Sequence, residues 1–404
     1  MALAISISAC TIAAAQVLRN GSVHAALRVS RSVASRATEA TGAVPGSVHS
    51  GDNLGGESVL RLKSREGVML LEAMDRAGFK AEPADVAIDA APYSGVYEVP
   101  PRNSGAPIAR LAKAELARAY RIDPSEIEAA VMEAPRPVSS RARDADHVLA
   151  IGLARRVVMP LMLDLDHAGI EPRRATLPHM ALCARAMQES GVAEAIAVID
   201  LSWSGAHLTV ALRDDTSDIW GGAVPCFVRH ISEASIVSLH DATTIRIGGS
   251  VDLASEVLGI TGRISGFDIS DSAAHEAARC VATAVRPLIT TYLDALATET
   301  ARSIAYVSHR HPASPITRVL VCGDGAGLPG VCDRLAGELG FDVSLLTPAA
   351  MVQWPEGLEH FASLPSMSPV VALAIESSQR SYGPAHSRGT RTQTHSHSVP
   401  GARV

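Results

Sequence analysis

Aromatic side chains are scarce in this 404-residue chain: phenylalanine, tyrosine and tryptophan together make up only 3% of it. This scarcity excludes a core built on aromatic rings, although hydrophobic residues still make up 47% of the chain. The interior must instead consist mainly of alanine, valine, leucine and isoleucine. A chain of this length has room for two or three domains, each large enough to bury such a core.

The chain also lacks an excess of positive charge. Its 36 lysine and arginine residues are outnumbered by 42 aspartate and glutamate residues, which gives a net charge of −6 at pH 7. Because nucleic-acid binding depends on cations that neutralise phosphates, we expect no nucleic-acid partner. No uncharged apolar run reaches the roughly 20 residues that cross a bilayer, so we expect no direct membrane span.

Cysteine pairs are missing as well. The six cysteines are scattered, without CxxC or histidine-paired spacing, which argues against a zinc site and a disulfide framework. Residues 377–404 are rich in serine, threonine, arginine and glycine, and we expect this tail to be disordered. Asp164 and His167 share a face of a predicted helix, but a solvated face near the helix end explains them better than a metal does.

The N-terminal segment raises the question of a secretory leader. A leader needs a basic start and an apolar core of roughly 7–15 residues, whereas no lysine or arginine precedes the apolar run here and polar residues interrupt it. Large aliphatic and small side chains alternate from residue 3 to residue 8, which is typical of a strand. The pair Asn20-Gly21 favours a tight hairpin turn. We predict three N-terminal strands and a cytoplasmic location.

Periodic patterns further along the chain predict alternating strands and helices. Strands are expected in "ADVAIDAAP", in "HVLAIGL" and on both sides of the polar turn in "AVIDLSWSGAHLTVAL". Helices are expected at residues 67–78, 108–120, 157–168, 178–189 and 272–305, the last broken near Pro287, and a further helix is expected to start at Pro124, capped by Asp123. The N-terminal hairpin is echoed about 195 residues later, which predicts a duplicated fold.

Three loops could carry phosphate chemistry. Each follows an apolar strand with small residues, which let backbone N–H groups approach a phosphate, while a nearby carboxylate can hold Mg²⁺ through water. The candidate residues are Ser6, Ser8 and Ala9 in the first loop, Asp200 and Ser202 in the second, and Gly323, Asp324, Gly325 and Ala326 in the third. Asp200 is the candidate metal residue.

Simpler interpretations of these loops remain open. The glycines could serve tight turns and helix–sheet packing, Asp200 could be a solvated turn residue, and Asp324 could form an Asx turn. The stretch "LSWSG" lacks the leading glycine of a nucleophile elbow, and no histidine or aspartate partner can be named from the sequence, so a serine hydrolase is disfavoured.

The order of these loops resembles the actin-like ATPase superfamily and, within it, the PilM family of type IV pilus assembly proteins; the cell-division protein FtsA is a more distant relative. The similarity is densest in "ITRVLVCGDGAGLPGVCDRLAGELGFDVSLLTP" and extends through "IRIGGSVDLASEVLGIT" and "MSPVVALAIES". The resemblance implies an α/β, ribonuclease H-like fold of two duplicated lobes at residues 1–195 and 196–376, with small inserted subdomains at about 93–147 and 232–317.

The chain departs from the family pattern where chemistry would occur. The first loop has Ser6 in place of the family's metal aspartate and Ser8 in place of a glycine; Ser202 and Asp324 likewise replace glycines. Hydrolysis needs a positioned Mg²⁺ and a placed water. We therefore expect binding of ATP and Mg²⁺ to be weak or absent, and a pseudo-ATPase rather than an active enzyme.

The resemblance also implies a function. A PilM-like protein would be a scaffold of a type IV pilus or a type II secretion-like machine, peripheral to the inner membrane. It would bind the cytoplasmic N-terminal tail of a PilN-like membrane partner and link it to motor ATPases. The alternative is an active ATPase or small-molecule kinase of the same superfamily. An FtsA-like filament former is disfavoured because the polar C-terminus has no apolar face for a membrane.

Overall fold

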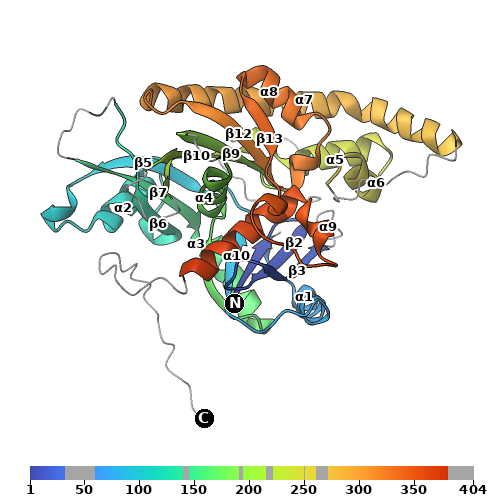
Figure 1. Ribbon diagram of the computed structural model, residues 1–404, viewed down its shortest axis with the longest axis horizontal. Coiled ribbons are helices and arrows are strands. Elements are labelled where there is room, and N and C mark those ends of the chain that lie inside the picture. The colour runs from blue at the N-terminus through green and yellow to red at the C-terminus, as the bar shows by residue number, and fades with distance from the viewer. Residues whose placement is uncertain are drawn as a thin grey trace, which may run out of the picture.

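The computed structural model describes residues 1–31, 60–138, 140, 145–190, 194–214, 222–249, 251–260 and 272–380. Within these residues the chain forms two five-stranded sheets and one three-stranded sheet, with helices packed around them (Figure 1). None of the helices in these ranges combines the length and the apolar character needed to cross a bilayer.

The first five-stranded sheet has the order β3-β2-β1-β4-β8. Its strands are β1 (Ala2–Ile7), β2 (Thr11–Val17), β3 (Val23–Ser30), β4 (Ala84–Ile88) and β8 (Pro172–Thr176). The first three strands pair antiparallel, whereas β4 and β8 run parallel to β1. The three predicted N-terminal strands are therefore present and form one half of this sheet.

The second five-stranded sheet repeats this plan. Its order is β11-β10-β9-β12-β13, and its strands are β9 (Ala195–Leu201), β10 (Ala206–Arg213), β11 (Ala223–Ile231), β12 (Ile316–Cys322) and β13 (Asp342–Leu345). The antiparallel and parallel pairings follow the same sequence as in the first sheet. The predicted duplication is thus visible in strand order and direction.

Helices cover both faces of each sheet. The α-helices are α1 (Ser64–Arg76), α2 (Ile108–Tyr120), α3 (Arg155–His167), α4 (His179–Ser190), α5 (Ile236–Arg246), α6 (Val251–Val257), α7 (Ser272–Arg310), α8 (Val331–Leu339), α9 (Glu359–Ala362) and α10 (Ser368–Arg380). Short 3₁₀ helices are η5 (Arg102–Ser104), η6 (Pro124–Glu126), η8 (Ser232–Ala234), η9 (Asp324–Gly327), η10 (Pro348–Ala350) and η11 (Pro365–Met367). Helices α1 and α3 pack on one face of the first sheet, and α5, α7 and α8 pack on one face of the second.

Two helices are exchanged between the halves of the chain. Helix α4 follows the first sheet in sequence but packs on the second, whereas α10 follows the second sheet and packs on the first. The two helices contact each other in the middle of the molecule (Figure 1). In β1 the large side chains Leu3 and Ile5 face α1 and α3, while Ala4 faces α10. Small residues on that side let α10 approach the sheet closely.

A buried ion-pair cluster holds α10 in place. Asp85 of β4 is fully buried and accepts hydrogen bonds from Arg173 Nε at 2.7 Å and Arg174 Nη2 at 2.8 Å. Ser377 of α10 donates a further hydrogen bond to the same carboxylate. Burial alone would raise the pKa of Asp85, but these hydrogen bonds hold that pKa below its usual range.

The three-stranded sheet forms a separate layer at the left of Figure 1. Its order is β5-β7-β6, from β5 (Tyr93–Val99), β7 (Asp146–Ala154) and β6 (Ile127–Glu133), and all pairings are antiparallel. Helix α2 packs on one face through Ala112 and Leu116. This small sheet runs from residue 93 to residue 154, so its middle strand β7 extends past the end of the insertion that the sequence suggested at about residues 93–147.

Local expectations were wrong at two places. Asp123 does cap a turn, because its carboxylate accepts a hydrogen bond from Ser125 N at 2.7 Å. The predicted helix is absent, however: only the three-residue η6 follows, and strand β6 begins after it. Pairing of β6 with β7 overrides the helix propensity of these residues. Helix α7 runs for 39 residues without a break. Pro287 lies exposed on its surface, where a proline disturbs a helix least.

Three other local details also differ. The Asn20-Gly21 hairpin closes through Gly21 N to Leu18 O at 3.0 Å, and only Gly21 has a positive φ, of 81°, so the turn is a longer loop than the two-residue type. Asp164 is not solvated but accepts from Arg61 Nε at 2.7 Å and Leu62 N at 3.0 Å. Of the predicted tail, residues 377–380 belong to α10, and the remainder lies outside the described residues.

Candidate functional site: the cleft between the two sheets

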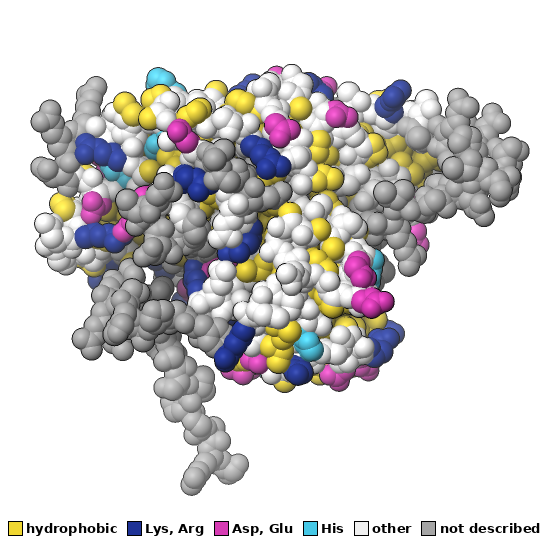
Figure 2. Space-filling model, viewed as in Figure 1, with side chains coloured by type: hydrophobic (Ala, Val, Ile, Leu, Met, Phe, Trp, Pro, Cys, Tyr) yellow, Lys and Arg dark blue, Asp and Glu magenta, His cyan; other side chains and the backbone are white. Residues whose placement is uncertain are grey.

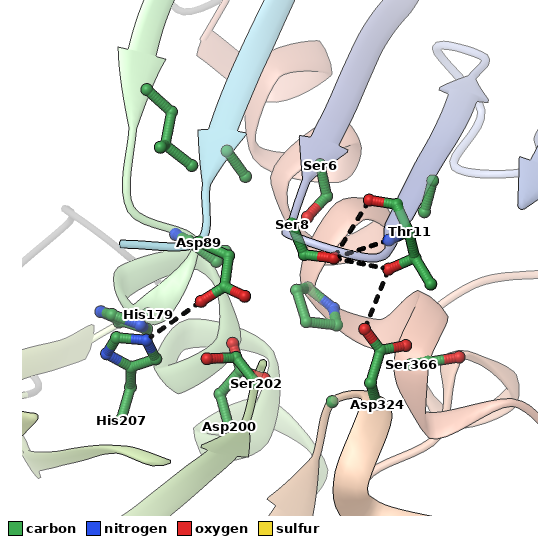
Figure 3. A pocket seen from close by; sticks show the side chains of 16 residues that line it. Ser6, Ser8, Thr11, Asp89, His179, Asp200, Ser202, His207, Asp324 and Ser366 are labelled. Atoms are coloured by element: carbon green, nitrogen blue, oxygen red, sulfur yellow. Dashed lines mark hydrogen bonds and ion pairs between the residues drawn. The ribbon is translucent and has the colours of Figure 1, made fainter. Parts of the chain in front are cut away.

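A small cleft, partly open to solvent, lies where the ends of strands from the two five-stranded sheets meet (Figure 3). The turn after β1, the end of β4, the turn after β9 and the loop after β12 all reach it. It is lined by Ser6, Ser8, Thr11, Ala13, Ala87, Ile88, Asp89, Pro178, His179, Asp200, Ser202, His207, Gly323, Asp324, Ser366 and Pro369. Six of the nine predicted site residues are in this set; Ala9, Gly325 and Ala326 are not.

The first loop is a serine-stabilised turn. Ser8 N donates to Thr11 O at 2.9 Å, and Thr11 N donates to Ser8 Oγ at 2.9 Å. Ser8 Oγ also lies 2.8 Å from Thr11 Oγ1. Because Ser8 uses its hydroxyl to close the turn, its backbone is not left open to a ligand as a glycine's would be. Ala9 instead packs against the core of the second sheet.

The second loop is built in the same way. Ser202 N donates to Gly205 O at 3.0 Å, and Ser202 Oγ donates to the same carbonyl at 2.8 Å. Gly205 has a φ of 156°, and a Cβ at this position would lie 2.7 Å from Ile231 O. Only glycine therefore fits where the turn meets β11.

The glycine-rich third loop owes its glycines mainly to packing. A Cβ on Gly323, whose φ is 90°, would lie 2.3 Å from Asp200 Oδ1 and 2.6 Å from Leu201 O. A Cβ on Gly325 would lie 2.4 Å from Ile236 Cδ1, and Ala326 is part of the core of the second sheet. Helix α8 begins at Val331, and the short helix η9 precedes it. The structure supports the simpler interpretation for Gly325.

Asp200 points into the cleft from the end of β9. It is only 6% exposed, and no hydrogen bond from another described residue reaches its carboxylate. Burial raises the pKa of Asp200 to about 7; His207 opposes this rise, while the carboxylates of Asp89 and Asp324 add to it. A carboxyl in this state would gain from a bound cation.

Asp89, which the sequence analysis missed, is the most heavily bonded carboxylate of the cleft. It follows β4 and accepts hydrogen bonds from Trp203 N at 3.1 Å, Ser204 N at 3.4 Å and Ser204 Oγ at 2.5 Å. Burial alone would raise the pKa of Asp89, but hydrogen bonding to His207 and Ser204 outweighs it and holds that pKa below its usual range. The only sequence signal was an aspartate directly after a buried strand.

Asp324 is bound by the first lobe. Thr11 Oγ1 donates to Asp324 Oδ2 at 2.9 Å, and Arg28 Nη2 donates to Asp324 Oδ1 at 2.8 Å (Figure 3 shows the first of these contacts). Arg28 Nη2 also donates to Ile260 O at 3.0 Å. The charge that Asp324 adds to the cleft is thus neutralised by Arg28. These contacts, rather than an Asx turn, explain its position.

Three histidine rings line up at one side of the cleft. His207 lies between His179 and His230, with ring centroids 4.7 Å apart in both pairs. Burial lowers the pKa of His230 to about 3 and lowers that of His179 well below its usual value. Among the residues that the structure describes, no group of three or more histidine, cysteine, aspartate or glutamate side chains could hold a metal ion.

The arrangement of Ser204, His207 and Asp89 is not a hydrolase triad. A triad places histidine between serine and aspartate. Here Ser204 Oγ donates directly to Asp89, and the same atom of His207, Nε2, faces both Ser204 Oγ at 3.4 Å and Asp89 Oδ1 at 3.7 Å. The disfavoured serine hydrolase has no support in this geometry.

Comparison with solved structures places the fold. A structure described as the PilM–PilN type IV pilus biogenesis complex matches with a TM-score of 0.66 and 17% identity, over 93% of this chain and 98% of that chain. The ethanolamine utilization protein EutJ from Carboxydothermus hydrogenoformans matches with a TM-score of 0.44 and 12% identity, over 93% and 89% of the two chains. The activator of the 2-hydroxyisocaproyl-CoA dehydratase from Clostridium difficile, with bound ADPNP, matches with a TM-score of 0.41 and 10% identity, over 94% of each chain.

Sequence comparison adds nothing to this result, because no family model and no curated protein sequence matches the chain. At 17% identity the likeness to PilM shows the fold. The predicted α/β, actin-like fold with two duplicated lobes is confirmed, and so is the resemblance to PilM at the level of the fold.

Proposed function

We propose that this chain is a PilM-like scaffold that binds the cytoplasmic N-terminal tail of a PilN-like inner-membrane protein. The observation that carries the proposal is the similarity in fold, over 93% of the chain, to a protein whose structure is described as a complex with PilN. In this role the chain would lie on the cytoplasmic side of the inner membrane, held there by its partner. It would belong to a type IV pilus or a related secretion machine and would link its membrane partner to the motor ATPases.

We place the tail-binding surface within residues 93–147. This part of the chain holds α2 and the strands β5 and β6 of the small sheet, which is a sheet of its own and packs against β11 of the second large sheet (Figure 1). Helix α2 on this sheet carries Leu111, an apolar side chain that is 38% exposed. We choose Leu111 as the probe of this surface, because a short peptide can bind beside a helix through apolar contacts.

A binding assay with matched variants tests this proposal. A fluorescent peptide covering the tail of a PilN-like protein should bind the wild-type chain, and Leu111→Asp should weaken binding. Ile245→Asp, on α5 of the other lobe, is the matched control, because Ile245 is also an exposed apolar helix residue, at 80%. Failure of folded wild-type protein to bind any such tail would count against the scaffold. Equal loss in both variants would count against the proposed surface.

We further propose that the cleft works without efficient nucleotide turnover. Ser6 stands where the family has its metal aspartate, and Asp200 brings a carboxylate close to any incoming phosphate. Like charges repel, and each ~1.4 kcal/mol of lost binding energy is a tenfold loss of affinity. Figure 2 shows acidic and basic side chains interspersed over one face of the molecule.

Calorimetric titration with ATP and Mg²⁺ decides between the scaffold and an active enzyme. We expect no heat at millimolar ATP. Micromolar binding that is lost in Asp200→Ala would show that Asp200 serves a nucleotide–metal site and would favour the alternative, an ATPase or small-molecule kinase. Binding that persists in Asp200→Ala would place any nucleotide elsewhere on the chain.

A further inference from the structure

The register of the two sheets makes Asp89 and Asp324 equivalent positions of the duplicated fold. Ile7 and Leu201 are the last residues of β1 and β9, and each is followed by a turn that closes through a serine, Ser8 or Ser202. Ile7 pairs with Ile88, so the residue that follows the pair is Asp89. In the second sheet Asp200 pairs with Cys322, which sets Leu201 opposite Gly323 and makes Asp324 the residue that follows.

Each of these aspartates binds the turn of the opposite lobe. Asp89, from the first sheet, accepts two backbone N–H groups and one hydroxyl of the turn after β9. Asp324, from the second sheet, accepts the hydroxyl of Thr11 in the turn after β1, together with Arg28. Figure 3 shows the two carboxylates pointing in opposite directions across the cleft. The exchange is reciprocal, as it is for helices α4 and α10.

The turn after β9 has the chemistry of an oxyanion site. Successive N–H groups in a turn form a concave nest that binds anions, and hydrogen bonds to a charged acceptor are stronger than neutral ones. Trp203 N and Ser204 N point at the same oxygen, Asp89 Oδ2, while Ser204 Oγ binds Oδ1. The side chain of Asp89 is only 7% exposed, so the carboxylate fills this nest and excludes water.

We propose that the turn after β9 is an oxyanion-binding site and that Asp89 of the opposite lobe occupies it. An internal carboxylate thus occupies the donors of this turn that a phosphate or free carboxylate would otherwise use. The proposal concerns the cleft alone and does not depend on the PilN-like partner or on ATP. Its failure therefore leaves the proposed function untouched, and the reverse also holds.

Amide hydrogen exchange at Trp203 and Ser204 tests the proposal directly. In Asp89→Ala these two amides lose their acceptor, and their exchange should accelerate at least about tenfold, which corresponds to about 1.4 kcal/mol. Asp342→Ala is the control, because Asp342 is 73% exposed and lies on the edge strand β13. Unchanged exchange in Asp89→Ala, or the same acceleration in Asp342→Ala, would overturn the proposal.

Chemical rescue then separates an anion site from simple packing. Acetate added to Asp89→Ala should restore protection of the two amides, whereas sodium chloride at equal ionic strength should not. Inorganic phosphate, in a second arm, shows whether the nest also accepts a phosphate oxygen. Acceleration that neither acetate nor phosphate reverses would mean that the turn is not an oxyanion site. If Asp89→Ala does not fold, Asp89→Asn keeps the side-chain shape without the charge, and acceleration of the same two amides is the expected result.

Discussion

At the scale of single residues, Asp200 is the carboxylate whose protonation should respond most to its surroundings. Burial raises its pKa to about 7, from an ordinary value near 4. Between those two pH values the folded chain holds a proton that the unfolded chain has released. Stability is therefore fully present at low pH and is lost as the pH rises through about 7.

Replacing Asp200 with asparagine should remove the loss of stability that ionisation of the buried carboxylate causes. We expect Asp200→Asn to become progressively more stable than the wild type as the pH rises from 5 to 7, by about 1.4 kcal/mol for each pH unit, with no further gain above that range. Urea unfolding at several pH values measures the difference. A difference that does not change with pH would show that Asp200 is ionised throughout. If Mg²⁺ stabilises the wild type at pH 8 but not the variant, Asp200 holds the cation.

At the scale of elements, glycine positions show how closely the helices pack. Helix α1 crosses α3 at Gly67, where a Cβ would lie 2.7 Å from the Cβ of Ala168. That atom is fixed to the backbone, so α1 and α3 would have to move apart. Gly337 in α8 is also helical, but nothing lies within 4 Å of a Cβ there. The two glycines therefore provide a matched pair.

Alanine substitutions at these glycines should have opposite effects. Gly337→Ala should stabilise the chain by about 0.5–1 kcal/mol, because alanine loses less backbone entropy in a helix than glycine does. Gly67→Ala gains the same helix propensity, but the added methyl group is too close to Ala168 at the contact between α1 and α3. This overpacking costs about 1–3 kcal/mol, so the net effect should be destabilising. Urea denaturation of both variants checks the sign. Stabilisation by both would mean that α1 and α3 separate at no cost.

At the scale of the whole molecule, the two lobes are joined because each contributes a helix and an aspartate that contact the other lobe. Helices α4 and α10 each pack on the other half's sheet, and Asp89 and Asp324 each bind the other half's turn. The histidine row lies at the same junction, with His230 on β11 and His179 at the start of α4. Because His179 is buried, His230 is partly buried and the pKa of each lies below its usual value, acid should weaken this junction before it affects the outer layers.

The contribution of His230 can be measured by difference. Its folded pKa of about 3 lies below the ordinary value near 6.5, so the unfolded chain binds an extra proton between those values and stability falls as the pH falls below about 6.5. In the wild type, Asp200 acts with the opposite sign over the same range. We therefore compare the variant with the wild type: His230→Gln should lower the slope of stability against pH between 5 and 6.5 by about 1.4 kcal/mol per pH unit relative to the wild type. Parallel pH profiles of wild type and variant would contradict this.

The sequence by itself determined the pattern of the fold. Alternation of large and small side chains in residues 3–8, the echo of the N-terminal hairpin in residues 195–213 and the limits of helix α2 at 108–120 are sequence signals, and the structure has the elements that they predict. The same signals predicted six site residues that line one cleft, because equivalent ends of duplicated strands meet there: Ser6, Ser8, Asp200, Ser202, Gly323 and Asp324.

Only the tertiary structure decided which groups meet across that cleft. Asp89 binds a turn more than one hundred positions away, and Asp324 meets Arg28 from the other end of the chain. No periodicity encodes such contacts, because they depend on how two lobes are set against each other. Residues 127–133 became a strand for the same reason: their alanine, glutamate and methionine favour a helix locally, but the neighbouring β7 supplies hydrogen bonds that only an extended partner can satisfy.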